Sequence, residues 1–99
     1  MQEEHLILVH ELCIYHNVEL KFIHSLQEHG LIKLTNVEEK SFIPFSQLLE
    51  LEKMIRLHYD LDVNVEGIDV IHHLVKKLED AQNEIGRLKI RLKFYGEMD

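Results

Sequence analysis

The segment that decides the fold is NVEGIDVIHHLVKKLEDAQNEIGRLKIRLKFYG, residues 64–96. Its apolar side chains are spaced alternately three and four residues apart, which is the a/d repeat of a coiled coil held for four heptads. A helix cannot bury such a stripe against itself, so this one requires a partner helix. We expect a homodimer, the alternative being a helix that folds back on its own domain. The a/d stripe comprises Ile71, Leu74, Leu78, Ala81, Ile85, Leu88, Leu92 and Tyr95.

The start of this helix carries ordinary capping signals. Asn64 is a suitable N-cap, and Glu66 lies in the first turn, where the positive end of the helix dipole favours an acid. About 30 residues at 1.5 Å each give a helix about 45 Å long. In an antiparallel pair, Lys77 at a g position would face Glu84 of the other copy, but the residues leave parallel pairing open.

The composition indicates a folded, acidic protein. Hydrophobic residues make up 45% of the 99 residues, which argues against disorder. Eighteen acids against eleven Lys and Arg give a net charge of −7. Residues 1–60 hold ten of the acids and five of the bases, a net charge of −5. Such a surface repels phosphate backbones and attracts basic proteins.

We expect three parts: a winged helix-turn-helix globule over residues 1–62, a coiled-coil helix over residues 63–96 and a tail at 97–99. The start of the chain is acidic and predicts no secretory signal. No apolar run approaches the about 20 residues of a membrane span. The single cysteine, Cys13, excludes an internal disulfide. These features predict a cytoplasmic protein that does not bind membranes.

The first part of the chain predicts a helix-turn-helix. Residues 6–8 form a short strand or extended lead-in, and a helix follows over residues 9–16. Asn17 tolerates the positive φ of a tight turn, and Gly30 is a strong helix stop. A second helix then spans residues 19–30. Its apolar side is predicted to comprise Leu20, Ile23, Leu26 and Gln27.

The next part predicts a β-hairpin wing and a third helix. Residues 31–35 and 41–43 favour strands, and the polar residues 36–40 favour the turn between them. Pro44 breaks the second strand, Ser46 caps the third helix, and residues 60–63 connect it to the last one. The predicted fold class is mostly α: a winged helix-turn-helix with a short β-hairpin wing and a long C-terminal dimerisation helix.

The sequence offers little for catalysis or metal binding. His10, Cys13 and His16 are the best candidate metal ligands, but positions i and i+6 of a helix are rotated by about 240°, so the three cannot converge. No glycine-rich phosphate loop or nucleophile signature is present. We therefore predict a protein that is not an enzyme and has no cofactor and no metal site.

The charges of the predicted reading elements argue against DNA binding. Residues 19–28 hold one Lys, two acids and no Arg, and residues 36–40 hold two acids and one Lys. Phosphate contacts need cations on these elements, and base readout favours Arg, Asn or Gln. A winged helix-turn-helix used for something other than nucleic acid is the preferred interpretation.

Four motifs occur along the chain: Glu11-Leu-Cys-Ile-Tyr-His16, Glu28-His-Gly-Leu-Ile32, Phe42-Ile-Pro-Phe-Ser-Gln-Leu48 and Arg56-Leu-His-Tyr-Asp-Leu-Asp-Val-Asn-Val-Glu-Gly-Ile68. The order of elements resembles the MerR-type winged-helix fold, and these motifs resemble the MerR-like chaperone modulators of the CbpM family. The resemblance covers most of the chain. It implies a chaperone modulator that binds the J-domain of a DnaJ-like co-chaperone of the CbpA type and inhibits its activity. It also implies a partner surface that is basic, because J-domains present a basic helix to Hsp70.

The face that would dock the J-domain is left open by the sequence. One acidic candidate patch lies on the third helix and its connector, and Glu38 and Glu39 in the wing form a second. Phe45 and Tyr59 are candidate anchors, since exposed ion pairs alone give little affinity. Two other function classes stay open: a MerR-type transcription regulator that binds DNA as a dimer, and a plain dimerisation module. The first patch comprises Glu50, Glu52, Asp60 and Asp62.

Overall fold

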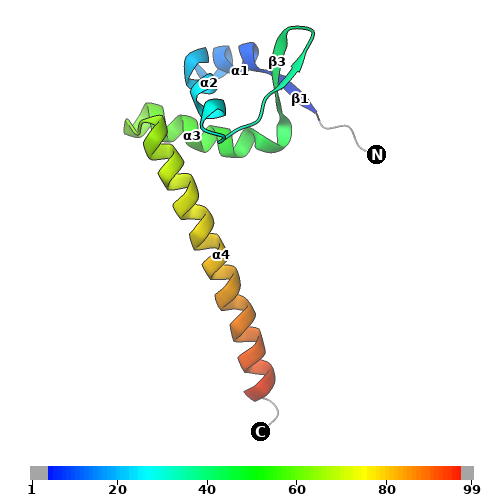
Figure 1. Ribbon diagram of the computed structural model, residues 1–99, viewed down its shortest axis with the longest axis vertical. Helices are drawn as coiled ribbons and strands as arrows, with labels where there is room; N and C mark the ends of the chain where they lie inside the picture. The colour runs from blue at the N-terminus through cyan, green and yellow to red at the C-terminus, as the bar shows by residue number, and fades with distance from the viewer. Residues whose placement is uncertain (1–4, 97–99) are drawn as a thin grey trace. The chain divides into compact units, whose positions relative to one another are not determined.

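The computed structural model describes residues 5–96, which form three strands and four α-helices within that range (Figure 1). Contacts divide the chain into two units, the first ending at Asp69 and the second beginning at Val70. We call residues 5–69 the globule. The predicted fold class is confirmed: the chain is mostly helical, with a small antiparallel sheet and a long C-terminal helix. The elements are β1 (Leu6–Leu8), α1 (Val9–His16), α2 (Leu20–Glu28), β2 (Thr35–Val37), β3 (Lys40–Pro44), α3 (Leu48–Leu61) and α4 (Val65–Gly96).

The helix-turn-helix forms where the sequence predicts it. Asn17 adopts φ 56° and ends α1, with the amide of Val18 bonded to the carbonyl of Cys13 at 2.9 Å. Gly30 adopts φ 73° just after α2, and the next amide, of Leu31, bonds to the carbonyl of Leu26 at 2.9 Å. Both turns satisfy helix carbonyls through a left-handed residue, which Asn and Gly adopt at low cost. Local chemistry therefore fixes this motif.

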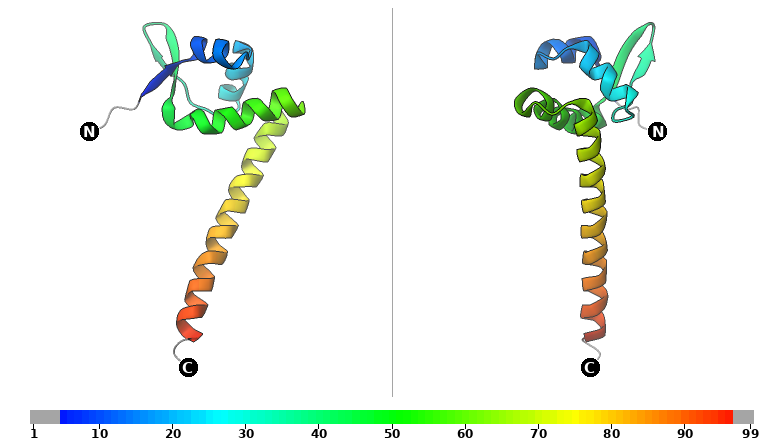
Figure 2. Two further views of the ribbon diagram at one scale, coloured as in Figure 1. Left: turned by 180° about the vertical axis from the view of Figure 1, so that it is seen from behind. Right: turned by 60° about the vertical axis from the view of Figure 1, so that its left-hand side comes forward.

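The core of the globule lies between α1, α2 and the start of the sheet on one side and α3 on the other, as Figures 1 and 2 show. The amphipathic assignment of α2 needs one correction. Ile23 and Leu26 are buried as expected, but Leu20 and Gln27 are exposed and Phe22 is buried in their place. The buried set comprises Val9, Leu12, Val18, Phe22, Ile23, Leu26, Leu31, Ile32, Ile43, Leu51, Met54, Ile55 and Ile68.

The predicted first strand of the wing was wrong. Residues 31–34 form a loop, because Leu31 and Ile32 are buried in the core and the side chain of Gln47 bonds to both backbone polar groups of Lys33. Gln47 Oε1 accepts from the Lys33 amide at 2.8 Å, and Gln47 Nε2 donates to the Lys33 carbonyl at 3.0 Å. The strand is displaced to β2, so the hairpin turn shrinks to Glu38 and Glu39.

The sheet has the strand order β1-β3-β2, and both pairings are antiparallel. Ile7 of β1 pairs with Ile43 of β3, which is fully buried, and Thr35 of β2 pairs with Phe42. The lead-in at residues 6–8 is therefore a true strand that fixes the base of the wing to the start of α1. We keep the word wing for the β2–β3 hairpin.

The predicted cap of the third helix was also wrong. Residues Phe45–Gln47 form a single 3₁₀ turn after Pro44, and α3 begins at Leu48 with Gln47 as its N-cap. No side-chain bond caps this end, because the glutamine side chain is bound to the loop at Lys33 instead. At the other end, Asp62 adopts φ 56° and the amide of Val63 bonds to the carbonyl of Leu57.

The start of α4 is held in the globule. Asn64 caps the helix as predicted, since its Oδ1 accepts a hydrogen bond from the Gly67 amide at 2.8 Å. A Cβ at position 67 would lie 2.8 Å from Val63 Cγ1, so only glycine allows this close approach. The next residue, Ile68, is 1% exposed and joins the core. The Glu-Gly-Ile motif thus anchors the first turn of the long helix.

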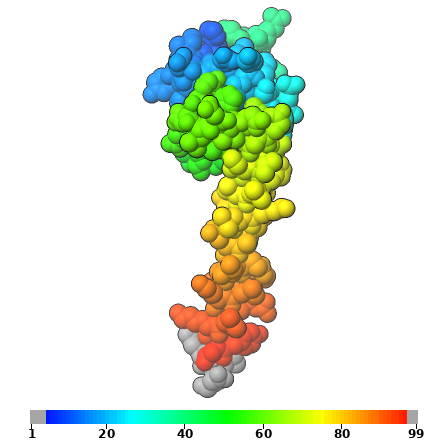
Figure 3. Space-filling model, turned by 90° about the vertical axis from the view of Figure 1, so that its left-hand side faces the viewer, coloured from blue at the N-terminus to red at the C-terminus, as the bar shows by residue number. Residues whose placement is uncertain are grey.

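The helix itself continues without a break to Gly96, 32 residues in all and about 48 Å long. In Figure 3 its yellow-to-red part is a single helix with its side chains exposed on the face shown. Within residues 5–96, no helix is long and apolar enough to cross a bilayer. The predicted division of the chain at residue 62 stays a prediction, and the tail predicted at 97–99 lies outside the described residues.

Candidate protein-binding surface

The outer face of α2 carries little positive charge. Its cation, Lys21, is exposed and pairs with Glu19 at 3.5 Å, while Glu28 at the other end is exposed. Leu20, in the first turn, is 49% exposed despite being aliphatic. This face therefore presents an apolar side chain flanked by acids rather than a row of cations.

The wing ends in a turn with an unusual residue choice. Glu38 and Glu39 adopt φ 51° and 67°, and they lie between the paired residues Val37 and Lys40. Two-residue turns with positive φ at both positions favour Asn-Gly, because a side chain with a Cβ is strained there by about 1–2 kcal/mol per residue. The turn therefore carries two exposed glutamates at positions whose positive φ disfavours most residues other than Gly and Asn.

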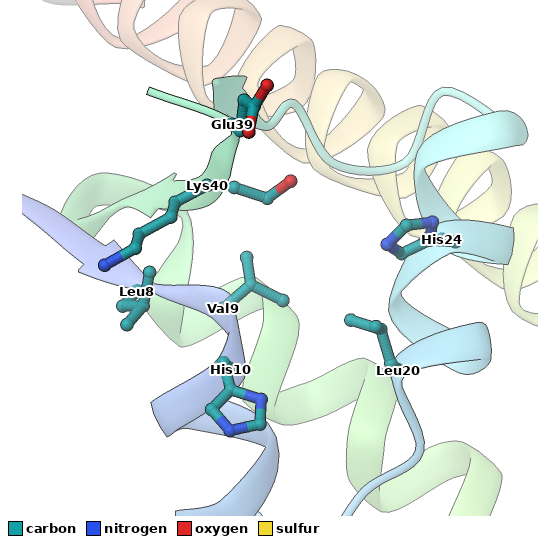
Figure 4. A pocket seen from close by; sticks show the side chains of 8 residues that line it. Leu8, Val9, His10, Leu20, His24, Glu39 and Lys40 are labelled. Atoms are coloured by element: carbon teal, nitrogen blue, oxygen red, sulfur yellow. The ribbon is translucent and has the colours of Figure 1, made fainter. Parts of the chain in front are cut away.

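A groove of about 450 Å³ lies between α2, the start of α1 and the wing (Figure 4). Leu8, Val9 and Leu20 supply its apolar surface, and Glu39 and Lys40 lie at its wing side. Figure 4 shows His10 and His24 on the two helices, on either side of Val9 and Leu20. The groove is open and mainly apolar, with one carboxylate, that of Glu39, and one lysine at its wing side. The remaining lining residue is Ser41.

The acidic patch predicted on α3 is placed on the exposed half of the helix, but it is interrupted by basic residues. Glu50 pairs with Lys53 at 3.5 Å, and Glu52 lies 3.5 Å from the ring of His16. Arg56 is exposed on the same helix. Asp60 and Asp62 are exposed at its C-terminal end. The docking role of all these residues stays a prediction.

The two predicted anchors, Tyr59 and Phe45, differ in the contacts that they make within the globule. Tyr59 Oη accepts a hydrogen bond from the Glu19 amide at 3.0 Å, and its ring packs edge-to-face on Phe22 at 5.4 Å. Tyr59 therefore fixes the start of α2 while remaining 39% exposed. Phe45 is 57% exposed and makes one ring contact, with His5 at 6.3 Å.

The a/d stripe of α4 is unsatisfied within the chain. Leu74, Leu78 and Ile85 are each more than half exposed, and the same holds for Leu92 and Tyr95. Glu84, which could bond across an antiparallel pair, is engaged by Arg87 on its own helix. Ile71 and Leu88 are less exposed, and Ala81 lies between them on the same stripe.

Among residues 5–96, no three His, Cys, Asp or Glu side chains lie close enough together to hold a metal ion. Cys13 packs against the core beside Leu12, and partial burial raises the pKa of its thiol above the ordinary value. It is therefore a protonated, poorly nucleophilic side chain at neutral pH.

The model of the MerR HTH family, described as regulatory proteins, matches residues 7–90 of the chain. The chain therefore belongs to the MerR helix-turn-helix family. No curated protein and no solved structure matches it. In this family assignment, α1 and α2 are the helix-turn-helix and the β2–β3 hairpin is the wing.

Sequence reasoning identified Glu38 and Glu39 but missed the groove beside them. Leu20 was placed in the core, because its spacing from Ile23 fits a buried stripe. The sequence did contain a sign that Leu20 is exposed: Phe22 is a larger apolar residue of the same helix, and it is Phe22 that is buried in the core. His10 was considered only as a candidate metal ligand.

Proposed function

We propose that the protein is a non-catalytic chaperone modulator: it binds the J-domain of a DnaJ-like co-chaperone, of the CbpA type, and inhibits its activity. It would act in the cytoplasm as a homodimer. The proposal combines the membership of the MerR family with the resemblance of four sequence motifs to the CbpM family.

The observation that carries the proposal is the charge of α2 and the wing. In a helix-turn-helix reader these elements contact DNA, and their cations supply much of the affinity. Here residues 19–28 and 35–44 together hold four acids and two lysines, one of them paired with Glu19. The net charge of −2 repels a phosphate backbone and favours a basic protein surface.

The basic helix that J-domains present to Hsp70 is a partner of the required charge. A protein that covers this helix prevents the Hsp70 encounter, so inhibition needs no catalytic group. Dimerisation through the a/d stripe of α4 would place two such surfaces in one particle, and the exposed leucines support it.

The test is a titration of the purified protein with an isolated J-domain, together with the J-stimulated ATPase rate of Hsp70. We expect saturable binding that weakens as salt rises, and inhibition of the stimulated rate but not of the basal rate. Absence of binding at J-domain concentrations of about 0.1 mM would reject the proposal.

A second candidate is a dimeric DNA-binding regulator of the MerR type. The family match favours it, because helix-turn-helix and wing are both retained. A gel-shift titration with a DNA duplex distinguishes the two functions. Affinity that falls steeply with salt would support the DNA-binding regulator, and its absence leaves the J-domain proposal as the better account.

A further inference from the structure

The groove between α2 and the wing is open and mainly apolar. Its volume of about 450 Å³ accommodates a few side chains, and its apolar part is formed by Leu8, Val9 and Leu20. A half-exposed leucine on the outer face of α2 has no role in the core of the globule. It is available to bury an apolar side chain of a partner.

The carboxylates beside the groove indicate the charge of that partner. Glu39 lines the groove, and Glu38 precedes it in the same turn, where both residues hold positive φ. Within residues 5–96, neither glutamate forms an ion pair. Figure 4 shows Lys40, the cation of the groove, extending along its β1 side toward Leu8. The wing side of the groove thus holds one lining carboxylate, that of Glu39, next to Lys40, and Glu38 adds a second carboxylate in the adjoining turn.

We propose that this groove, rather than the acidic residues of α3, docks the basic helix of the J-domain. An apolar side chain of that helix would pack on Leu20 and Leu8, the lining leucines that the core leaves accessible, and its Lys or Arg neighbours would pair with Glu38 and Glu39. This inference rests on the proposed function and assigns its binding face. A nucleic acid is disfavoured as the occupant because both the apolar surface and the wing carboxylates oppose phosphate.

The first test variant is Glu38→Asn/Glu39→Gly, which replaces the turn by residues suited to positive φ. We expect Tm to rise by on the order of 5 °C while the Kd for an isolated CbpA-type J-domain increases at least about tenfold. Because stability and affinity move in opposite directions, unfolding cannot explain the loss. The charge control is Glu79→Gln/Asp80→Asn on α4, for which we expect less than about a twofold change in Kd.

The second variant is Leu20→Ala, expected to increase the Kd about tenfold, with Leu49→Ala as the matched control. Leu49 is 64% exposed on α3, so its truncation removes similar apolar surface away from the groove. We expect its Kd to stay within about twofold of the wild type.

Three outcomes overturn the groove assignment in different ways. If both groove variants bind the J-domain like the wild type while Glu50→Lys/Asp60→Lys loses affinity, the proposed function stands and α3 is the docking face. If the wild type does not bind the J-domain, function and groove assignment fail together. If Glu38→Asn/Glu39→Gly strengthens retention of a DNA duplex at about 0.15 M salt, the occupant is nucleic acid.

Discussion

The globule buries thirteen hydrophobic side chains among its own elements, whereas residues 70–96 of α4 bury none. Residues 70–96 are entirely helical, while the globule also contains turns and a loop, and both regions have apolar side chains at helical spacing. The difference is that α1, α2 and α3 cover one another, while most of the a/d side chains of α4 are exposed in the described part of the chain. An exposed stripe of this kind favours association, so we expect the long helix to depend on a second copy.

The largest expected effect comes from disrupting the a/d stripe. Leu78→Asp/Ile85→Asp introduces four charges into a dimer interface, which should cost at least about 4 kcal/mol and raise the dimer Kd about a thousandfold. Sedimentation should show monomers, and circular dichroism should show a loss of helix, because an isolated helix with an uncovered stripe is marginal in water. A persistent dimer would place the interface elsewhere.

The next prediction concerns the core of the globule, which should matter for stability but not for dimerisation. Leu51→Ala removes a fully buried side chain of α3 and should lower the free energy of unfolding by about 2–5 kcal/mol in a urea titration, without changing the dimer seen by sedimentation. Leu49→Ala, two residues away and exposed, is the control and should change it by less than about 0.5 kcal/mol. Equal effects of the two variants would contradict the assignment of the core.

A smaller effect is expected where the two regions join. Asn64→Ala removes the acceptor of the Gly67 amide and should cost about 1 kcal/mol, with faster hydrogen exchange at that amide. Asn83→Ala, in the exposed middle of α4, is the control and should be neutral or slightly stabilising, since alanine favours the helix interior. Unchanged exchange at Gly67 would mean that the cap does not hold the start of α4.

An effect of similar size is expected at Tyr59, where it separates a structural role of this residue from a role in binding. Tyr59→Phe removes the acceptor of the Glu19 amide and should destabilise the globule by about 0.5–1.5 kcal/mol. Exchange at the Glu19 amide should accelerate, and the aromatic packing on Phe22 should persist. Tyr15→Phe, at an 84% exposed position, is the control and should have no measurable effect. A loss of J-domain affinity without a change in stability would instead make Tyr59 a contact residue.

The comparison also shows which parts of the fold local chemistry can predict. Asn17, Gly30 and Asn64 act at helix ends through their own backbone preferences or side-chain bonds, and all three were predicted correctly. The predicted strand at residues 31–34 and the predicted cap at Ser46 failed together. The cap failed because Phe45–Gln47 form a 3₁₀ turn and α3 begins only at Leu48. The strand failed because Leu31 and Ile32 are buried and because Gln47 bonds to the backbone of Lys33. That bond joins positions fourteen residues apart, and no local pattern indicates it.

The candidate site likewise has features that the sequence predicts and features that depend on the tertiary structure. The acids of the wing and the scarcity of cations on α2 could be predicted from residue types alone. The groove could not, because it needs the start of α1, one face of α2 and the wing to meet, and this depends on the pairing of β1 with β3. The exposure of Leu20 follows from Phe22 taking the core position, which is a question of packing.

The sequence by itself determined the helix-turn-helix, the length and apolar stripe of the last helix and the acidic surface, because each depends on residue type and spacing along one segment. Only the tertiary structure decided the register of the wing, the start of α3 and the groove beside Leu20. These depend on contacts between segments far apart in the chain, where burial and hydrogen bonding outweigh local preference.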